Sequence, residues 1–375
     1  MSGVAGRINK LVNRSFDIIL LCLFIFILAV GLLLYGINSY LESNKTKIID
    51  NISFLQEAHV RFGESYITIF RDFPNASLII RDVAVRDSSY HKTKNPVLFI
   101  NELQVEISIV DWRQKDVKIQ SLEINGGEIN LIADAEGNYN IATILSGLQN
   151  QNQHEEENNS DLTIDSKNID LSLSDFDFII YDTLRTTSIR VTANSLGTKL
   201  INDNGNIQGD LEFDVNVEEL TFEKENGSFL KGAHLVGKTK TRFIANKLSL
   251  DPFEIMIDDR PFSFEAEVVT DGSEPTVLFI KNDHLNFQQL KQLLSPNIAK
   301  TLKPYNVKQA FPASADITIN SGDPVKVEVD FALKHHDIAI NDIPFSNTKL
   351  KGRFINRNMM ILELILNQMD ISDFS

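Results

Sequence analysis

The chain has 375 residues, of which 43% are hydrophobic, and a formal net charge of −15. This acidity argues against a nucleic-acid partner, because binding to phosphates needs clustered Lys and Arg, and we expect none. The only cysteine, Cys22, lies in an apolar run. The rest of the chain therefore has no thiol for a disulfide, a cysteine nucleophile or a thiolate metal site.

Ile18 to Ile37 is an apolar run without a charge, and Arg7, Lys10 and Arg14 precede it. About 20 apolar residues span a bilayer core as a helix, and basic residues favour the cytoplasmic side. We expect a transmembrane signal anchor over residues 16–41, a cytoplasmic N-terminus over residues 1–15, and the bulk of the chain across the membrane. The alternative is a cleaved signal peptide, whose apolar region is shorter, about 7–15 residues.

The anchor is followed by a segment with helical periodicity, Asn44 to His59, which we expect to be a helix. From Tyr66 onward the period changes to two, as in Leu103 to Ile109, which is typical of half-buried strands. The same rhythm predicts strands over Leu78–Val85, Val117–Ile124 and Ile129–Ile132, with turns at Phe73-Pro74-Asn75, Asn125-Gly126-Gly127 and Glu136-Gly137-Asn138, and a short helix over Ile141–Leu148.

Residues 149–160 (QNQNQHEEENNS) contain no apolar side chain. Such a tract cannot bury enough surface to offset its ordering entropy. We therefore expect a polar linker over residues 149–161. It would separate a leading-helix and β domain over 42–148 from a β-rich region over 162–375.

Alternation resumes at Leu162, but its phase slips within one segment. Apolar residues are odd-numbered up to Leu173 and even-numbered from Phe176, which predicts a turn or a bulge between them. A helical interruption follows near 286–303, where Asn286 and Gln289 match a capping box and Ser295-Pro296 can start a second helix.

The predicted fold class is mainly β, an extended, curved antiparallel sheet with a few short helices. What covers its apolar face stays open at this point. A second sheet would make a sandwich, whereas an open sheet would leave a hydrophobic trough and a binding site. In either case one interior should receive eight residues: Phe213, Val215, Phe253, Ile255, Phe262, Phe264, Val327 and Val329.

Catalytic motifs are not found. The chain has no G-x-S-x-G, P-loop or G-x-G-x-x-G, and the pair His335-His336 would point to opposite faces of a strand. The acidic pair Asp258-Asp259 fits a turn better than an acid–base pair. We expect no enzyme, no cofactor and no metal site.

Two stretches carry a family resemblance: FPNASLIIRDVAVRD (73–87) and VLFINELQVEISIVDWRQKDVKIQSLEINGGEINLIADAEGNYNI (97–141). They resemble the N-terminal domain of the AsmA family of Gram-negative envelope proteins, over about a fifth of the chain. The positions that match are Ile119, Leu122, Ile124, Gly127, Ile129, Leu131, Asp134, Gly137 and Asn140.

The resemblance implies a periplasmic protein anchored in the bacterial inner membrane, which carries phospholipid along a β-sheet groove in outer-membrane biogenesis. Family members are often longer, so the chain is either a short form or truncated at its C-terminus. One alternative is an assembly factor that binds outer-membrane proteins by β-augmentation at a sheet edge. Another is an exported hydrolase on a β scaffold.

Overall fold

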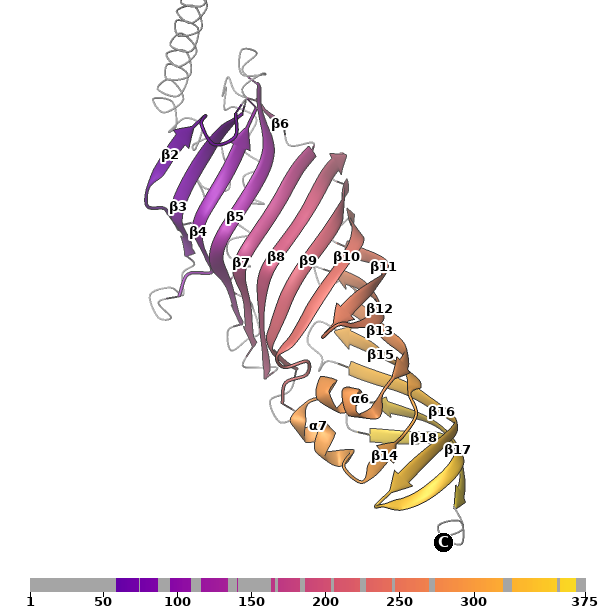
Figure 1. Ribbon diagram of the computed structural model, residues 1–375. Helices are drawn as coiled ribbons and strands as arrows, with labels where there is room; N and C mark the ends of the chain where they lie inside the picture. The colour runs from indigo at the N-terminus through magenta and orange to yellow at the C-terminus, as the bar shows by residue number, and fades with distance from the viewer. Residues whose placement is uncertain are drawn as a thin grey trace, which may run out of the picture.

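The strands of the chain are hydrogen-bonded into one long, curved sheet, and two short helices lie beside its C-terminal strands (Figure 1). The computed structural model describes residues 59–73, 75–86, 95–108, 116–133, 140, 163–165, 168–182, 186–203, 206–222, 227–244, 247–269, 274–319, 326–355 and 358–368. The expected anchor (16–41), the short helix (141–148) and the linker (149–161) lie outside these ranges. Within them, no helix combines the length and the hydropathy of a membrane span.

The first half of the sheet contains β1 (His59–Arg61), β2 (Ser65–Thr68), β3 (Ala76–Arg86), β4 (Leu98–Ile107), β5 (Asp116–Ala133), β6 (Thr163–Asp165), β7 (Asn168–Asp182), β8 (Thr187–Asp203) and β9 (Asn206–Thr221). The second half contains β10 (Ala233–Ile244), β11 (Lys247–Ile257), β12 (Arg260–Val269), β13 (Thr276–Leu285), α6 (Phe287–Leu293), α7 (Pro296–Thr301), β14 (Tyr305–Val307), β15 (Phe311–Ile319), β16 (Lys326–Ile340), β17 (Ile343–Ile355) and β18 (Asn358–Gln368).

The sheet is one layer thick over the described residues. β1 and β2 both pair with β3, and the ladder then runs β4, β5, β7 to β13, β15, β16, β17 and β18. Among the described strands, every two in extensive contact are ladder neighbours, so no second sheet built from these residues covers the first. The sandwich alternative is therefore wrong for these residues. The regions predicted over 42–148 and 162–375 share this sheet through the β5–β7 ladder.

The prediction of an antiparallel sheet is correct except around β5. This strand pairs in parallel with both β6 and β7. Parallel neighbours cannot be joined by a hairpin, and no local signal reveals their pairing.

The strands predicted over Leu78–Val85 and from Leu103 are confirmed in β3 and β4, and the eight predicted interior residues lie in strands β9, β11, β12 and β16. The predicted turn at Asn125-Gly126-Gly127 is wrong. β5 runs through these residues as one strand, with φ of 70° at Gly126 and 148° at Gly127. The helix expected over Asn44–His59 is wrong at its last residue, because His59 begins β1. The rest of that segment lies outside the described residues.

A line of backbone distortions crosses the N-terminal strands and explains the phase slip. Asp175 in β7 has φ of 50°, and the register places it between Gly126 of β5 and Asn194 of β8. Asp82 of β3, with φ of 53°, lies on the same line opposite Asn101 of β4. Each distortion adds one residue to the strand and so shifts the alternation of side chains by one position. Leu173 and Phe176, which lie on either side of Asp175, therefore point to the same face.

Asp175 supplies a test of this line. A β-branched residue is poorly tolerated at positive φ, so Asp175→Val should lower the free energy of unfolding by about 1–2 kcal/mol. Asp175→Gly should be neutral or stabilising, because glycine adopts this conformation without strain. Urea denaturation of both variants measures the difference, and equal stability would show that Asp175 is not strained.

The local signals near the C-terminal half are confirmed. Asp258 and Asp259 both have positive φ, at 48° and 62°, as a two-residue hairpin turn between β11 and β12 requires. Asn286 caps α6 through the N–H of Gln288, and the Gln289 side chain accepts from the N–H of Asn286, which completes the capping box. Ser295 caps α7 and Pro296 occupies its first turn.

Candidate functional site

Register traces one continuous apolar face across the sheet, because residues paired across a ladder point to the same side. We name it the apolar track and define it by one paired row. In ladder order the row is Ile80, Leu103, Ile124, Leu173, Leu196, Phe213, Gly237, Ile255 and Phe262. From Ile80 on β3 to Phe262 on β12 the row has eight ladder steps, which at about 4.8 Å each gives a length of about 38 Å.

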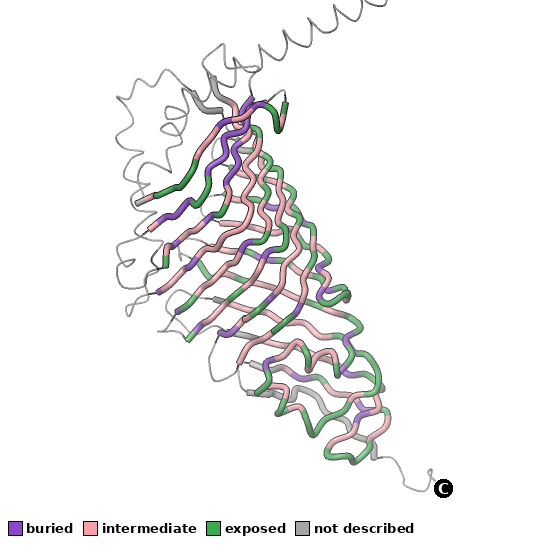
Figure 2. The backbone as a smooth tube through the Cα atoms, turned by 60° about the vertical axis from the view of Figure 1, so that its left-hand side comes forward, coloured by how far each residue is buried: buried purple, intermediate pink, exposed green. Residues whose placement is uncertain are grey.

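Burial changes along the track. Its N-terminal end lies in a cluster on β2 to β7, where Ile80 is 0% and Leu103 3% exposed. The central residues Leu173, Leu196 and Phe213 are half-buried. Figure 2 shows the same trend, with buried positions concentrated on the N-terminal strands. The centre of the track is therefore the part that is open to a ligand.

The eight predicted interior residues share this face. Five of them meet in one cluster on β9 to β12: Phe213, Phe253, Ile255, Phe262 and Phe264. The ring centroid of Phe253 lies 6.0 Å from that of Phe213 and 5.6 Å from that of Phe264, and both pairs have edge-to-face geometry. Ile255 and Phe262 are buried, whereas Phe213, Phe253 and Phe264 are half-buried.

The remaining three predicted residues lie outside that cluster. Val215 lies two residues after Phe213 on β9, pairs with Leu235 of β10 and is half-buried. Val329 pairs with Ala315 on β15, further along the same face. Val327 is placed on this face by its backbone register alone, since its side chain is outside the described set.

The helix pair covers the C-terminal end of the track. Leu290 and Leu293 of α6 pack on the cluster around Phe262, and the carbonyl of Leu293 accepts from the N–H of Leu230 at 3.0 Å. Phe287 is 5% exposed and packs with Phe311 in a further cluster. The sequence predicted both helices but not their role as a cover. It also missed Leu173, Leu196 and Gly237, whose place on the track depends on strand order.

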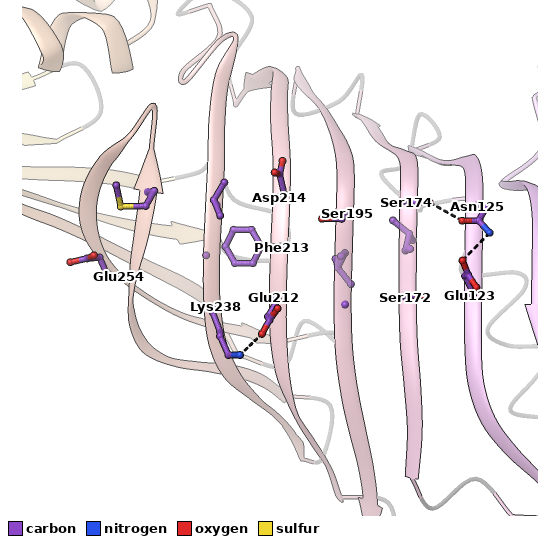
Figure 3. Close-up of a pocket in the computed structure, with 16 residues that line it drawn as sticks. Glu123, Asn125, Ser172, Ser174, Ser195, Glu212, Phe213, Asp214, Lys238 and Glu254 are labelled. Atoms are coloured by element: carbon purple, nitrogen blue, oxygen red, sulfur yellow. Dashed lines mark hydrogen bonds and ion pairs between the residues drawn. The ribbon is translucent and has the colours of Figure 1, made fainter. Parts of the chain in front are cut away.

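The opposite face of the same strands carries many polar side chains. A hollow of about 660 Å³ lies over β5 to β11 (Figure 3), and its lining combines these side chains with four residues of the track, Leu173, Leu196, Phe213 and Gly237. Some of its polar groups pair with one another. Lys238 pairs with Glu212, the Ser174 hydroxyl donates to Asn125 Oδ1 at 2.8 Å, and Asn125 Nδ2 donates to Glu123 at 3.2 Å.

Beside the hollow, Asp214 lies at the centre of a hydrogen-bond network. It accepts from Asn194 Nδ2 at 2.6 Å, and His234 Nε2 lies 2.8 Å from the same oxygen. The hydrogen bond from Asn194, and next that from His234, lower the pKa of Asp214 below its ordinary value. Asp214 therefore stays ionised to a lower pH than an ordinary aspartate does.

A charged cluster on β15 to β17 gives a pH-dependent prediction. Arg353 donates to both oxygens of Asp330, at 2.7 and 2.8 Å, and this hydrogen bonding lowers the pKa of Asp330. Burial, and then the charges of Asp330 and Glu328, raise the pKa of Asp316. Ionised Asp330 therefore stabilises the fold above its unfolded-state pKa near 4, and that contribution is lost as the pH falls further. Ionised Asp316 destabilises it as the pH rises through its raised pKa.

We expect Asp330→Asn to be destabilising and Asp316→Asn to be stabilising at neutral pH. Each effect should stay within about 1 kcal/mol, because these side chains are partly exposed to water. The Asp316→Asn difference should shrink as the pH is lowered toward about 4, whereas the Asp330→Asn difference should persist to about pH 4 and shrink only below it. Urea denaturation across this range measures them, and the same sign of change for the two variants would contradict the assignment.

Over the part of the chain that the structure describes, no group of three or more His, Cys, Asp or Glu side chains is arranged to hold a metal ion. Comparison with known proteins adds no assignment: no protein-family model matches the chain, and no curated protein matches it. The architecture and the track are therefore the basis for a functional proposal.

Proposed function

We propose that this protein is a non-enzymatic lipid carrier of the bacterial envelope, anchored in the inner membrane by residues 16–41 with its sheet in the periplasm. Phospholipid acyl chains lie along the apolar track while headgroups face water. The observation that carries the proposal is the single-layered sheet, whose apolar face is continuous and only half-buried at Leu173, Leu196 and Phe213. The resemblance of residues 73–140 to the AsmA family points to the same function.

Magnitudes agree with a lipid ligand. Each buried CH₂ group contributes about 0.8 kcal/mol, so covering two acyl chains on the track is strongly favourable. An acyl chain extends over about half of a bilayer core, or about 15 Å. The track, at about 38 Å, is long enough for two acyl chains end to end. The net charge of −15 and the paired polar groups of the opposite face keep the carrier soluble.

The test is recovery of bound phospholipid without detergent. A protease site placed within residues 42–47 of the full chain allows the folded periplasmic region to be released from proteoliposomes by cleavage. Mass spectrometry of the released region should detect phospholipid at a defined stoichiometry. A released region that is folded and free of lipid would overturn the proposal.

One observation favours the assembly-factor alternative. Among the described strands, β18 pairs with β17 alone, and its eleven residues could accept a further strand by β-augmentation. This alternative predicts capture of an outer-membrane protein strand along β18 and no bound phospholipid. The released region therefore separates the two functions.

A further inference from the structure

The loop between β2 and β3 exposes two phenylalanine rings. Phe70 is 64% and Phe73 is 67% exposed, the two highest values among the large hydrophobic side chains that the structure describes. We name residues 69–75 the aromatic loop; Pro74 within it lies outside the described residues. Exposed aromatic side chains of this size in one short loop indicate a binding surface.

Hydrogen bonds hold the aromatic loop in place against the sheet. The Asp72 carboxylate accepts from the Ser77 hydroxyl and from Gln104 Nε2, the latter at 2.8 Å. The N–H of Asn75 donates to the Asp72 carbonyl at 2.8 Å, and Asn75 Nδ2 donates to Glu106 at 2.6 Å. The polar groups thus turn toward β3 and β4. The two rings are held outward in a preorganised position.

The aromatic loop lies at the N-terminal end of the apolar track. Ile67 at the end of β2 and Ile69 in the loop are 3% and 1% exposed and belong to the cluster that contains Ile80 and Leu103. A surface that binds Phe70 and Phe73 is therefore brought next to the first residues of the track.

We propose that the aromatic loop inserts Phe70 and Phe73 into the interfacial layer of a phospholipid bilayer and docks the N-terminal end of the track on the membrane. This inference rests on the anchored carrier proposed above. A bilayer fits this surface better than a protein does, because two rings bury only about 300–500 Å² together. A specific protein interface buries about 1,200 Å² or more. An anchored chain needs no such area, since tethering gives the loop a high effective concentration at the bilayer.

The charge beside the rings agrees with this partner. Arg71, whose side chain is 45% exposed, stands between them in the sequence and contacts Glu102 at 3.4 Å. Aromatic rings with a neighbouring cation are typical of segments that lie at the headgroup level of a membrane.

The test uses tryptophan as a depth probe in the full chain. The only natural tryptophan, Trp112, is replaced by Phe, and Phe73→Trp is added. The protein is reconstituted into vesicles whose phospholipids carry bromine on their acyl chains, which quenches nearby indole. The matched control is Tyr181→Trp, which is also exposed, at 49%, and lies at the opposite end of the strands.

Emission from position 73 should be blue-shifted and strongly quenched, while emission from position 181 should stay unquenched. Equal emission and quenching at the two positions would overturn the docking proposal. The outcome of this quenching experiment can be separated from the outcome of the phospholipid-recovery test of the proposed function. Quenching at position 73 with a lipid-free released region keeps the docking and overturns the carrier, whereas bound lipid without quenching does the reverse.

Discussion

Replacing Phe262 with aspartate is expected to unfold the C-terminal half of the sheet, whereas the same change at Phe264, two positions along β12, is expected to leave it folded. Phe262 is 5% exposed under the helix pair, so a carboxylate there has no water and no partner. Burying it should cost several kcal/mol. Phe264 is half-buried, so its carboxylate can reach water, and the loss should be about 1–2 kcal/mol of apolar contact.

The pair of variants separates stability from lipid binding. Phe264→Asp should retain a cooperative urea transition and lose bound phospholipid from the released region. Glu265→Gln, on the opposite face of β12, serves as the control and should change neither property. If Phe264→Asp unfolds like Phe262→Asp, the track at β12 is a closed core and not an open binding surface.

The second large effect is expected at Gly127, in the N-terminal half of the sheet. Its φ is 148°, and a Cβ atom there would lie 2.2 Å from the carbonyl oxygen of Phe99, which belongs to the backbone and cannot move aside. Gly127→Ala must therefore distort the β4–β5 ladder in addition to adopting a strained dihedral angle. We expect a loss of about 3 kcal/mol or more in the free energy of unfolding.

Gly197 of β8 is the matched control for this substitution. A Cβ atom at Gly197 meets nothing within 4 Å, and its φ is not in the left-handed region. Gly197→Ala should therefore be neutral or stabilise the protein by up to about 1 kcal/mol. Thermal unfolding of both variants measures the contrast, and similar transitions would show that the backbone around Gly127 can relax.

The sequence predicts most strands of this fold but not their partners. Alternation locates β9, β11 and β12, and the change of phase between Leu173 and Phe176 indicates the distortion at Asp175. Asn125-Gly126-Gly127 fails for a physical reason. A tight hairpin turn and a kink inside a strand both need positive φ, so the local signal is the same. Whether a turn or a kink forms depends on whether the flanking segments pair with each other or with β4 and β7, which is a long-range property.

The candidate site is predicted in the same partial way. Period two assigns Phe253, Phe262 and Phe264 to one face of their strands, and the register confirms it. Whether that face is open depends on the absence of a second layer, which alternation does not encode. The packing of Leu290 and Leu293 on this face could not be predicted from the sequence either, because an amphipathic helix does not specify the surface on which it packs.

We propose that acyl chains occupy the apolar track, and site-specific photo-crosslinking in living cells can detect them there. A photoreactive residue is placed at Leu196, half-buried at the centre of the track, and separately at Lys199, which lies on the polar face of β8 with its side chain 80% exposed. We expect phospholipid adducts at position 196 and none at position 199. Equal labelling at the two positions, or no adducts at position 196 in a folded protein, would contradict it.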